Sequence, residues 1–108
     1  MDKNNQFRKD PIGILNGHKS TVTDISVTED GDYLVSSSID STLILWETCE
    51  PFKCVAVYRA PSTERNGFNC VSAGKELIIS GSENGVVRIW PVFSPKFKSF
   101  FHQVENKL

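Results

Sequence analysis

The sequence lacks the features of a membrane-spanning, secreted or strongly charged protein. No apolar run in its 108 residues approaches the roughly 18 residues that a membrane-spanning helix needs. Residues Met1 to Gln6 contain no apolar signal-peptide core, so we expect an intracellular protein, cytoplasmic or nuclear. The net charge is −1 and no long run carries one sign, which argues against nucleic acid or an anionic membrane as the main partner.

Cysteine and histidine are too few and too scattered to predict a metal site. The three cysteines, Cys49, Cys54 and Cys70, form no pair with the two-residue spacing of zinc knuckles. The two histidines, His18 and His102, lie far apart in the sequence. We therefore predict no metal, no cofactor, and reduced thiols that are partly buried in strands.

A helical period of apolar residues is also missing, whereas β-branched residues gather in short runs between turn residues. Residues 22–27 alternate apolar and polar side chains, and Asp30-Gly31 favours a tight hairpin turn. The pattern predicts an all-β chain of two four-stranded antiparallel meanders. Their strands are expected at 22–27, 33–36, 42–46 and 52–58, and then at 68–72, 76–80, 86–90 and 96–101.

The two meanders share a sequence pattern that ends with tryptophan. Trp46 and Trp90 stand 44 residues apart. Before each of them, a short apolar run enters a serine-rich patch, an acidic or amide turn follows, and a second apolar run leads to the indole. Repetition with a period of about 40–45 residues is typical of stacked supersecondary units.

This period, with this ending, resembles the WD-repeat β-propeller family. The family motif pairs Gly-His with a later Trp-Asp; here Gly17-His18 precedes Trp46-Glu47 with 27 residues between them. The resemblance covers residues 12–101 and implies two propeller blades, an incomplete propeller. Blade one is expected at 12–58, where 12–15 form a strand of a preceding blade. A degenerate blade two is expected at 59–101, between a flexible tail at 1–11 and a tail at 102–108.

The resemblance also implies a structural tetrad of buried, hydrogen-bonded side chains in each blade. In blade one its members are His18, Ser36 (or Ser38, which shares its parity), Asp40 and Trp46. These groups can satisfy one another's donors and acceptors away from water. Glu47 departs from the family's usual Asp, but that position lies outside the tetrad. Blade two retains only a partial tetrad, with Ser80, Asn84 and Trp90, and no histidine occurs at the expected position near residues 59–62.

Three functional alternatives are weaker than the structural interpretation. His18, Asp40 and a nearby serine resemble a hydrolase set, yet the chain has no Gly-x-Ser-x-Gly elbow. The glycines around Ser82 lie between strands, with no helix N-terminus to bind a phosphate. The alternating lysines and phenylalanines of 96–101 fit an outer strand better than a nucleic-acid site.

Members of this family mostly present loops to other proteins, so the resemblance implies a protein-binding scaffold and no enzyme. The candidate contact residues lie in the loops on the face of the Gly-His turn. They are Lys19, Thr21, Ile39, Ser62, Arg65 and Glu83, with Ser20, Ser41, Thr63 and Glu64 beside them.

Two blades leave two apolar faces uncovered, because each blade of a repeat protein is covered by its neighbours. The chain is expected to be a fragment of a longer propeller, or to be completed by a partner protein. The third alternative is self-association through the open faces into an oligomeric propeller that binds a small ligand or glycan.

Overall fold

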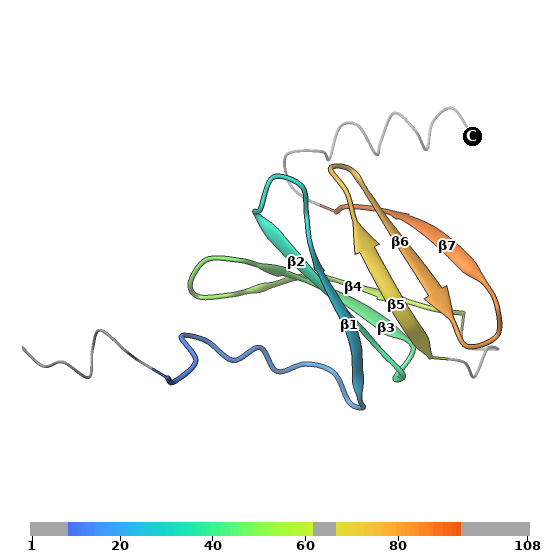
Figure 1. Cartoon of the computed structure of the whole chain (residues 1–108), viewed down its shortest axis with the longest axis horizontal. Helices are drawn as coiled ribbons and strands as arrows, with labels where there is room; N and C mark the ends of the chain where they lie inside the picture. The colour runs from blue at the N-terminus through green and yellow to red at the C-terminus, as the bar shows by residue number, and fades with distance from the viewer. Residues whose placement is uncertain (1–8, 62–66, 94–108) are drawn as a thin grey trace, which may run out of the picture.

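The described residues fold into two antiparallel sheets, one for each tryptophan (Figure 1). The computed structural model describes residues 9–61 and 67–93. Sheet A contains, in order, β1 (Val22–Val27), β2 (Tyr33–Ser38), β3 (Thr42–Glu47) and β4 (Cys54–Arg59). Sheet B contains, in order, β5 (Phe68–Ala73), β6 (Leu77–Ser82) and β7 (Val87–Pro91). The all-β expectation is confirmed, since no helix occurs among the described residues.

Two expected strands are not seen where the repeat places them. Sheet B has three described strands rather than four, and the fourth strand expected at 96–101 lies outside the described residues. Residues 12–15 form no strand, and Ile12 and Ile14 are 80% and 73% exposed. A strand is defined by pairing with a neighbour, and within the described residues no strand pairs with this segment.

Tight turns join neighbouring strands, and their backbone angles explain the turn residues. Gly31 and Gly85 have φ of 79° and 84°, which glycine adopts without steric cost. Ser41, between β2 and β3, has φ of 71° although it carries a side chain. The neighbouring Asp40 therefore has to hold this turn through side-chain contacts, which are described below.

The core lies between the two sheets, where β1 and β2 run beside β5 (Figure 1). Val35, Leu43 and Leu45 of sheet A meet Phe68 and Ile78 of sheet B, and all five are fully buried. At one edge of this core the rings of Tyr58 and Trp90 lie 5.5 Å apart, centroid to centroid. The two repeats are therefore held together by one shared apolar layer.

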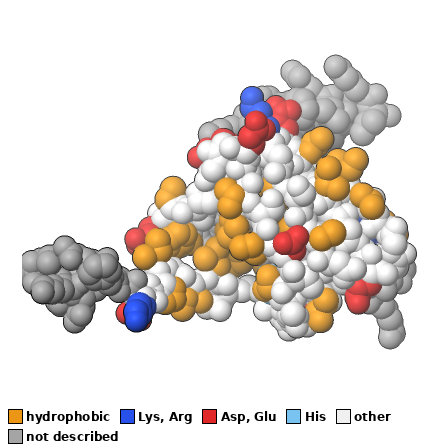
Figure 2. Space-filling model, in the orientation of Figure 1, with side chains coloured by type: hydrophobic (Ala, Val, Ile, Leu, Met, Phe, Trp, Pro, Cys, Tyr) orange, Lys and Arg blue, Asp and Glu red, His pale blue; other side chains and the backbone are white. Residues whose placement is uncertain are grey.

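The cysteines are free, but the expectation that they are partly buried is wrong. Cys49, Cys54 and Cys70 are all exposed. Cys49 follows the end of β3, and Cys70 lies on the face of sheet B that points away from sheet A. Strand membership buries a side chain only where another layer covers that face. Figure 2 shows hydrophobic side chains, in orange, reaching the surface over both sheets for the same reason.

Candidate functional site

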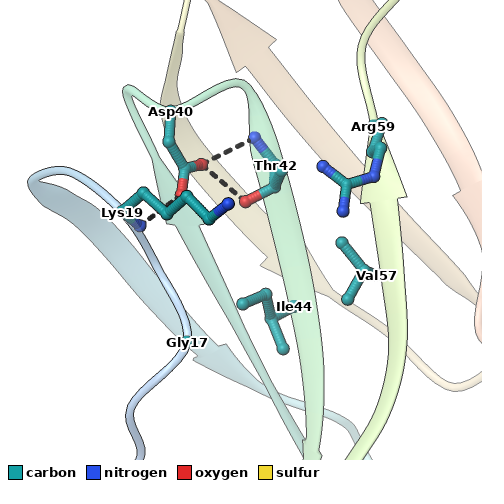
Figure 3. A pocket seen from close by; sticks show the side chains of 7 residues that line it. All are labelled: Gly17, Lys19, Asp40, Thr42, Ile44, Val57 and Arg59. Carbon is teal, nitrogen blue, oxygen red and sulfur yellow. Dashed lines mark hydrogen bonds between the residues drawn. The ribbon is translucent and has the colours of Figure 1, made fainter.

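Asp40 connects two turns at one end of sheet A. Its carboxylate accepts a hydrogen bond from the backbone N–H of Lys19 (2.8 Å) and another from the backbone N–H of Thr42 (2.9 Å) (Figure 3). The hydroxyl of Thr42 donates a third hydrogen bond to the same carboxylate. These contacts tie the turn before β1 to the turn between β2 and β3, and they hold Ser41 at its positive φ.

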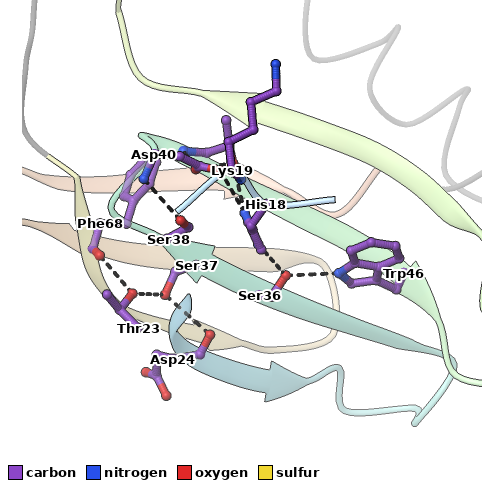
Figure 4. A network of polar contacts seen from close by, with 11 residues as sticks. His18, Lys19, Thr23, Asp24, Ser36, Ser37, Ser38, Asp40, Trp46 and Phe68 are labelled. Carbon is purple, nitrogen blue, oxygen red and sulfur yellow. Dashed lines mark hydrogen bonds and ion pairs between the residues drawn. The ribbon is translucent and has the colours of Figure 1, made fainter. Parts of the chain in front are cut away.

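His18 extends this contact into the sheet (Figure 4). Its Nδ1 lies 3.2 Å from the Asp40 carboxylate, and its Nε2 lies 2.7 Å from Ser36 Oγ. Trp46 Nε1–H donates to the same Ser36 Oγ at 2.9 Å. A proton on Nδ1 lets every group match: indole N–H to hydroxyl, hydroxyl to Nε2, and Nδ1–H to carboxylate. The structure thus brings the four tetrad residues of blade one into one chain of hydrogen bonds.

The structure also decides between the two serines and adds a residue that the sequence did not single out. Ser38 Oγ accepts a hydrogen bond from Asp40 N–H (3.0 Å), whereas Ser36 Oγ joins His18 to Trp46. Thr42 Oγ1 lies 3.1 Å from His18 Nδ1 as well as bonding Asp40. A hydroxyl residue two positions after a turn aspartate is a local signal for this kind of contact.

The charge of Asp40 is stabilised by the donors around it. Burial raises the pKa of this carboxyl, but the hydrogen bonds from Thr42, Lys19 and His18 outweigh that effect. The net pKa lies below its ordinary value of 3.8. Asp40 is therefore ionised at neutral pH, and its negative charge faces His18 at 3.2 Å.

The second repeat retains only part of this arrangement. Trp90 Nε1–H donates to Ser80 Oγ at 2.9 Å, the counterpart of the bond between Trp46 and Ser36. The side-chain oxygen of Asn84 accepts from the N–H of Val86, inside its own turn. Arg88 reaches Ser82 Oγ at 3.3 Å on the face that carries Trp90. The indole is packed between the rings of Tyr58 and Phe68.

The candidate contact residues that the structure describes lie in or next to turns at one end of both sheets, the lower end in Figure 1. Lys19 and Thr21 are exposed, and Ile39 is 42% exposed. Glu83 uses its carboxylate to accept the backbone N–H of Gly67 at 2.8 Å, so it has a structural contact that the sequence did not indicate. Ser62 and Arg65, with Thr63 and Glu64, lie outside the described residues.

A small pocket opens beside these turns (Figure 3). Its volume is about 90 Å³. Lys19 and Arg59 bring two positive charges to it, and Ile44 and Val57 form an apolar wall. The remaining lining residues are Gly17, Asp40 and Thr42. Arg59 was not among the predicted contact residues, because its place at the end of β4 becomes relevant only when the sheet brings it near Lys19.

The described residues contain no group of three or more His, Cys, Asp or Glu side chains that would hold a metal ion. The part of the chain that the structure describes also has no helix with the length and apolarity to cross a membrane. The hydroxyl of Ser36, which a hydrolase mechanism would use, is buried (5% exposed) and already accepts the Trp46 N–H.

Comparison with protein-family models finds the WD domain, G-beta repeat, at residues 9–47 and again at 52–91. Each match begins before the first strand of its sheet and ends at the tryptophan pattern. The two matches reproduce the repeat that Trp46 and Trp90 mark.

Curated relatives match over about three quarters of the chain. Myosin heavy chain kinase D of Dictyostelium discoideum is 29% identical over 80 residues, 74% of this chain and 8% of the kinase. Cell division control protein 4 of Saccharomyces cerevisiae is 32% identical over 73% of this chain and 10% of its own length. Small ribosomal subunit protein RACK1z of Oryza sativa subsp. japonica is 29% identical over 72% of this chain and 27% of its own length. The chain thus spans only a small part of each.

Among solved structures, the crystal structure of the computationally designed Ika4 protein superimposes with a TM-score of 0.64. The match covers 77% of this chain and 48% of that chain, at 18% sequence identity. At this identity the likeness concerns the fold alone.

Proposed function

Because the chain belongs to the WD domain, G-beta repeat family, we propose that it is a protein-binding segment of a β-propeller whose contact surface is the end carrying the Gly-His turn. Members of the family generally mediate protein–protein interaction. The surface, here called the turn rim, comprises the described turns 17–21, 39–41 and 83–85. The single observation that carries the proposal is the way Asp40 locks two of these turns together.

A rigid rim favours binding because little conformational entropy is lost when a partner docks. The backbone N–H of Lys19 is held by Asp40, which leaves the lysine side chain exposed above a fixed turn. Arg59 lines the same pocket, so the rim offers two cations over an apolar wall. This chemistry suits a protein segment that presents an acidic side chain next to an aliphatic one.

We propose that the hydrogen-bonded tetrad is structural and takes no part in catalysis. Ser36, His18 and Asp40 are hydrogen-bonded in the same series as the serine, histidine and aspartate of a hydrolase triad. A catalytic nucleophile, however, must be able to reach its substrate. Ser36 Oγ is buried and bonded to Trp46, and neither Ser36 nor His18 lines the neighbouring pocket. The network connects strands and turns, which supports a role in holding blade one together.

The remaining blades come, in this proposal, from a longer chain or from a partner; the alternative, further copies of this chain, is taken up in the next subsection. The short span of this chain on its relatives supports such completion. The expected partner is a protein rather than nucleic acid, given the net charge of −1. A cytoplasmic or nuclear location is proposed with it; the relative named as a small ribosomal subunit protein supports a role inside the cell.

The test compares one substitution at the two ends of the molecule. Lys19→Glu reverses a charge on the turn rim, and Lys75→Glu makes the same change at the opposite end; both lysines are exposed. Proteins captured from a cell extract by the wild-type chain should be lost with Lys19→Glu and retained with Lys75→Glu, as measured by quantitative mass spectrometry. Circular dichroism checks that both variants are folded. Equal capture by the two variants would overturn the rim as the contact surface.

A further inference from the structure

Each sheet has one face that no other sheet covers in the described structure, and large apolar side chains are exposed on both. On sheet A the face that carries Trp46 and Ser36, here called face A, exposes Val22, Ile25 and Val27 by 50–60%. On sheet B the face turned away from sheet A, here called face B, exposes apolar side chains by 47–69%. They are Leu77, Ile79, Val87 and Ile89. These side chains are too large and too close together to be an ordinary scatter of surface residues.

Face B repeats the surface that sheet A uses inside the chain. The registers of β2 with β3 and of β6 with β7 align the two sheets through Ser36 with Ser80 and Trp46 with Trp90. Under this alignment the four exposed residues of face B are the counterparts of Tyr33, Val35, Leu43 and Leu45. Val35, Leu43 and Leu45 are fully buried against sheet B, and Tyr33 packs against the same cluster. Face B is therefore apolar at the positions that form an inter-sheet core elsewhere in this molecule.

Face A repeats the other half of that internal contact. A bulge follows the first residue of both β1 and β5, and it aligns Val22 with Phe68. The exposed Val22, Ile25 and Val27 then correspond to Phe68, Val71 and Ala73. Phe68 and Val71 are buried against sheet A, and Ala73 packs against the same core. The chain thus presents, on opposite sides, the two complementary halves of an interface that it already contains once.

Polar groups in the contact between β1 and β5 support the same correspondence. Inside the chain, Thr23 Oγ1 donates to Phe68 O (2.8 Å), and Ser26 Oγ accepts from Ala73 N–H (2.9 Å) (Figure 4 shows the Thr23 contact). Their counterparts on β5 are Asn69 and Ser72, which keep a donor and an acceptor. The strand β5 therefore keeps one donor and one acceptor at the two corresponding positions.

At one position of this contact the two repeats differ, and a hydrogen bond within β1 compensates for the difference. Asp24 accepts the N–H of Val71 (3.0 Å), and its counterpart on β5 is Cys70, whose thiol is a weak acceptor. The N–H that Cys70 would face on another copy is that of Ile25. This N–H already donates to Asp24 of its own strand at 2.9 Å. The N–H of Ile25 would therefore keep its hydrogen bond when face B meets face A.

We propose that face B of one copy docks onto face A of a second copy, head to tail, in the arrangement that the two sheets adopt within one chain. Such a contact joins two different surfaces, so it leaves one free face at each end and propagates until it closes into a ring. The proposal concerns the sheet faces and does not depend on the turn rim.

The test measures the mass of the full 108-residue chain and of two one-face variants by size-exclusion chromatography with light scattering. Ile25→Glu places a charge on face A, and Ile89→Glu places one on face B. Both side chains are more than half exposed (60% and 66%), so neither change disturbs the internal core. Ser20→Glu adds the same charge on an exposed turn as the control.

The wild type and Ser20→Glu should have a mass several times 12.1 kDa, and each one-face variant alone should be a monomer. Mixed in equal amounts, the two variants should form a dimer and nothing larger, because each keeps the face that the other lacks. The dimer also proves that both variants are folded. A wild type that remains monomeric at high concentration overturns the proposal. Variants that dimerise alone, or a mixture that does not dimerise, contradict the head-to-tail arrangement.

Discussion

Replacing Ser36 by alanine is expected to destabilise the fold by about 3 kcal/mol. The hydroxyl of Ser36 binds Trp46 Nε1–H at 2.9 Å and His18 Nε2 at 2.7 Å, and the side chain is only 5% exposed. Its removal leaves a buried donor, Trp46 Nε1–H, and a buried acceptor, His18 Nε2, without this hydrogen-bond partner. Each orphaned buried group costs about 1–3 kcal/mol, so the loss is roughly 2–6 kcal/mol, and we take a value in the lower half of that range.

The second sheet supplies the matched control. Ser80 is 1% exposed, and its hydroxyl accepts the Trp90 N–H at 2.9 Å, without a histidine as second partner among the described contacts. Ser80→Ala therefore orphans one group where Ser36→Ala orphans two, and it should cost about 1–2 kcal/mol. The structural reading of the tetrad thus predicts that the first substitution costs about twice as much as the second.

Urea denaturation followed by far-UV circular dichroism measures both free energies of unfolding. The three proteins should have the same denaturant dependence, so that a shifted midpoint reports stability. Protein concentration has to be fixed below that at which the chain associates, because association would add to the apparent stability. Equal losses for the two variants, or a Ser36→Ala variant as stable as the wild type, would refute the reasoning.

Three further predictions test other contacts. Gly67→Ala should lower the free energy of unfolding by about 2 kcal/mol, since the added Cβ would lie 2.3 Å from the Cα of Ile39. At Gly74 the nearest atom to an added Cβ lies 3.6 Å away, so Gly74→Ala should change stability by less than about 1 kcal/mol in the same denaturation assay. Asp40 has a folded-state pKa below 3.8, so the stability that its carboxylate contributes is present above that value and is lost as the pH falls through the folded pKa. Urea unfolding midpoints measured from neutral pH to about pH 3 should therefore fall less steeply for Asp40→Asn than for the wild type. Burial raises the pKa of Tyr58 above 10.0, against the opposing hydrogen bond from Phe93 N–H, so its stabilisation is present below pH 10.0 and is lost as the pH rises through the folded pKa. In a Tyr33→Phe background, where Tyr58 is the remaining tyrosine, ultraviolet titration should give a midpoint above 10.0 for the folded chain, and a midpoint at or below that value would contradict this prediction.

The strands themselves were accessible from the sequence because alternation and turn chemistry act between near neighbours. The expected strand at 22–27 matches β1, and the expected strands near Tyr33 and Thr42 differ from β2 and β3 by two residues and one residue at their ends. The Asp-Gly pair and the short turn after Asp40 are likewise local features. The resemblance to WD repeats rested on the same short-range signals, repeated once.

The partners of individual side chains depended on contacts between distant segments. Ser36 and Ser38 share one face of β2, and only the position of His18, delivered by the turn before β1, gives Ser36 the bond to Trp46. The sequence predicts Glu83 as a contact residue, whereas in the fold its carboxylate accepts the backbone N–H of Gly67, 16 positions earlier. Arg59 reached the turn rim only through the pairing of β4 with β3.

Burial was decided at the same level. The sequence by itself determined an all-β chain of two WD repeats, and it predicted a complete tetrad in the first repeat and a partial one in the second. It also made both faces of each sheet apolar, since the same pattern recurs in both repeats. Which of these faces is covered depends on which layers are present: the inner faces of the two sheets bury Val35 and Phe68, while Ile25 and Ile89, on the same kind of strand, are exposed. Alternation along a strand sets the face a side chain points to, and only the neighbouring layer sets whether water reaches it.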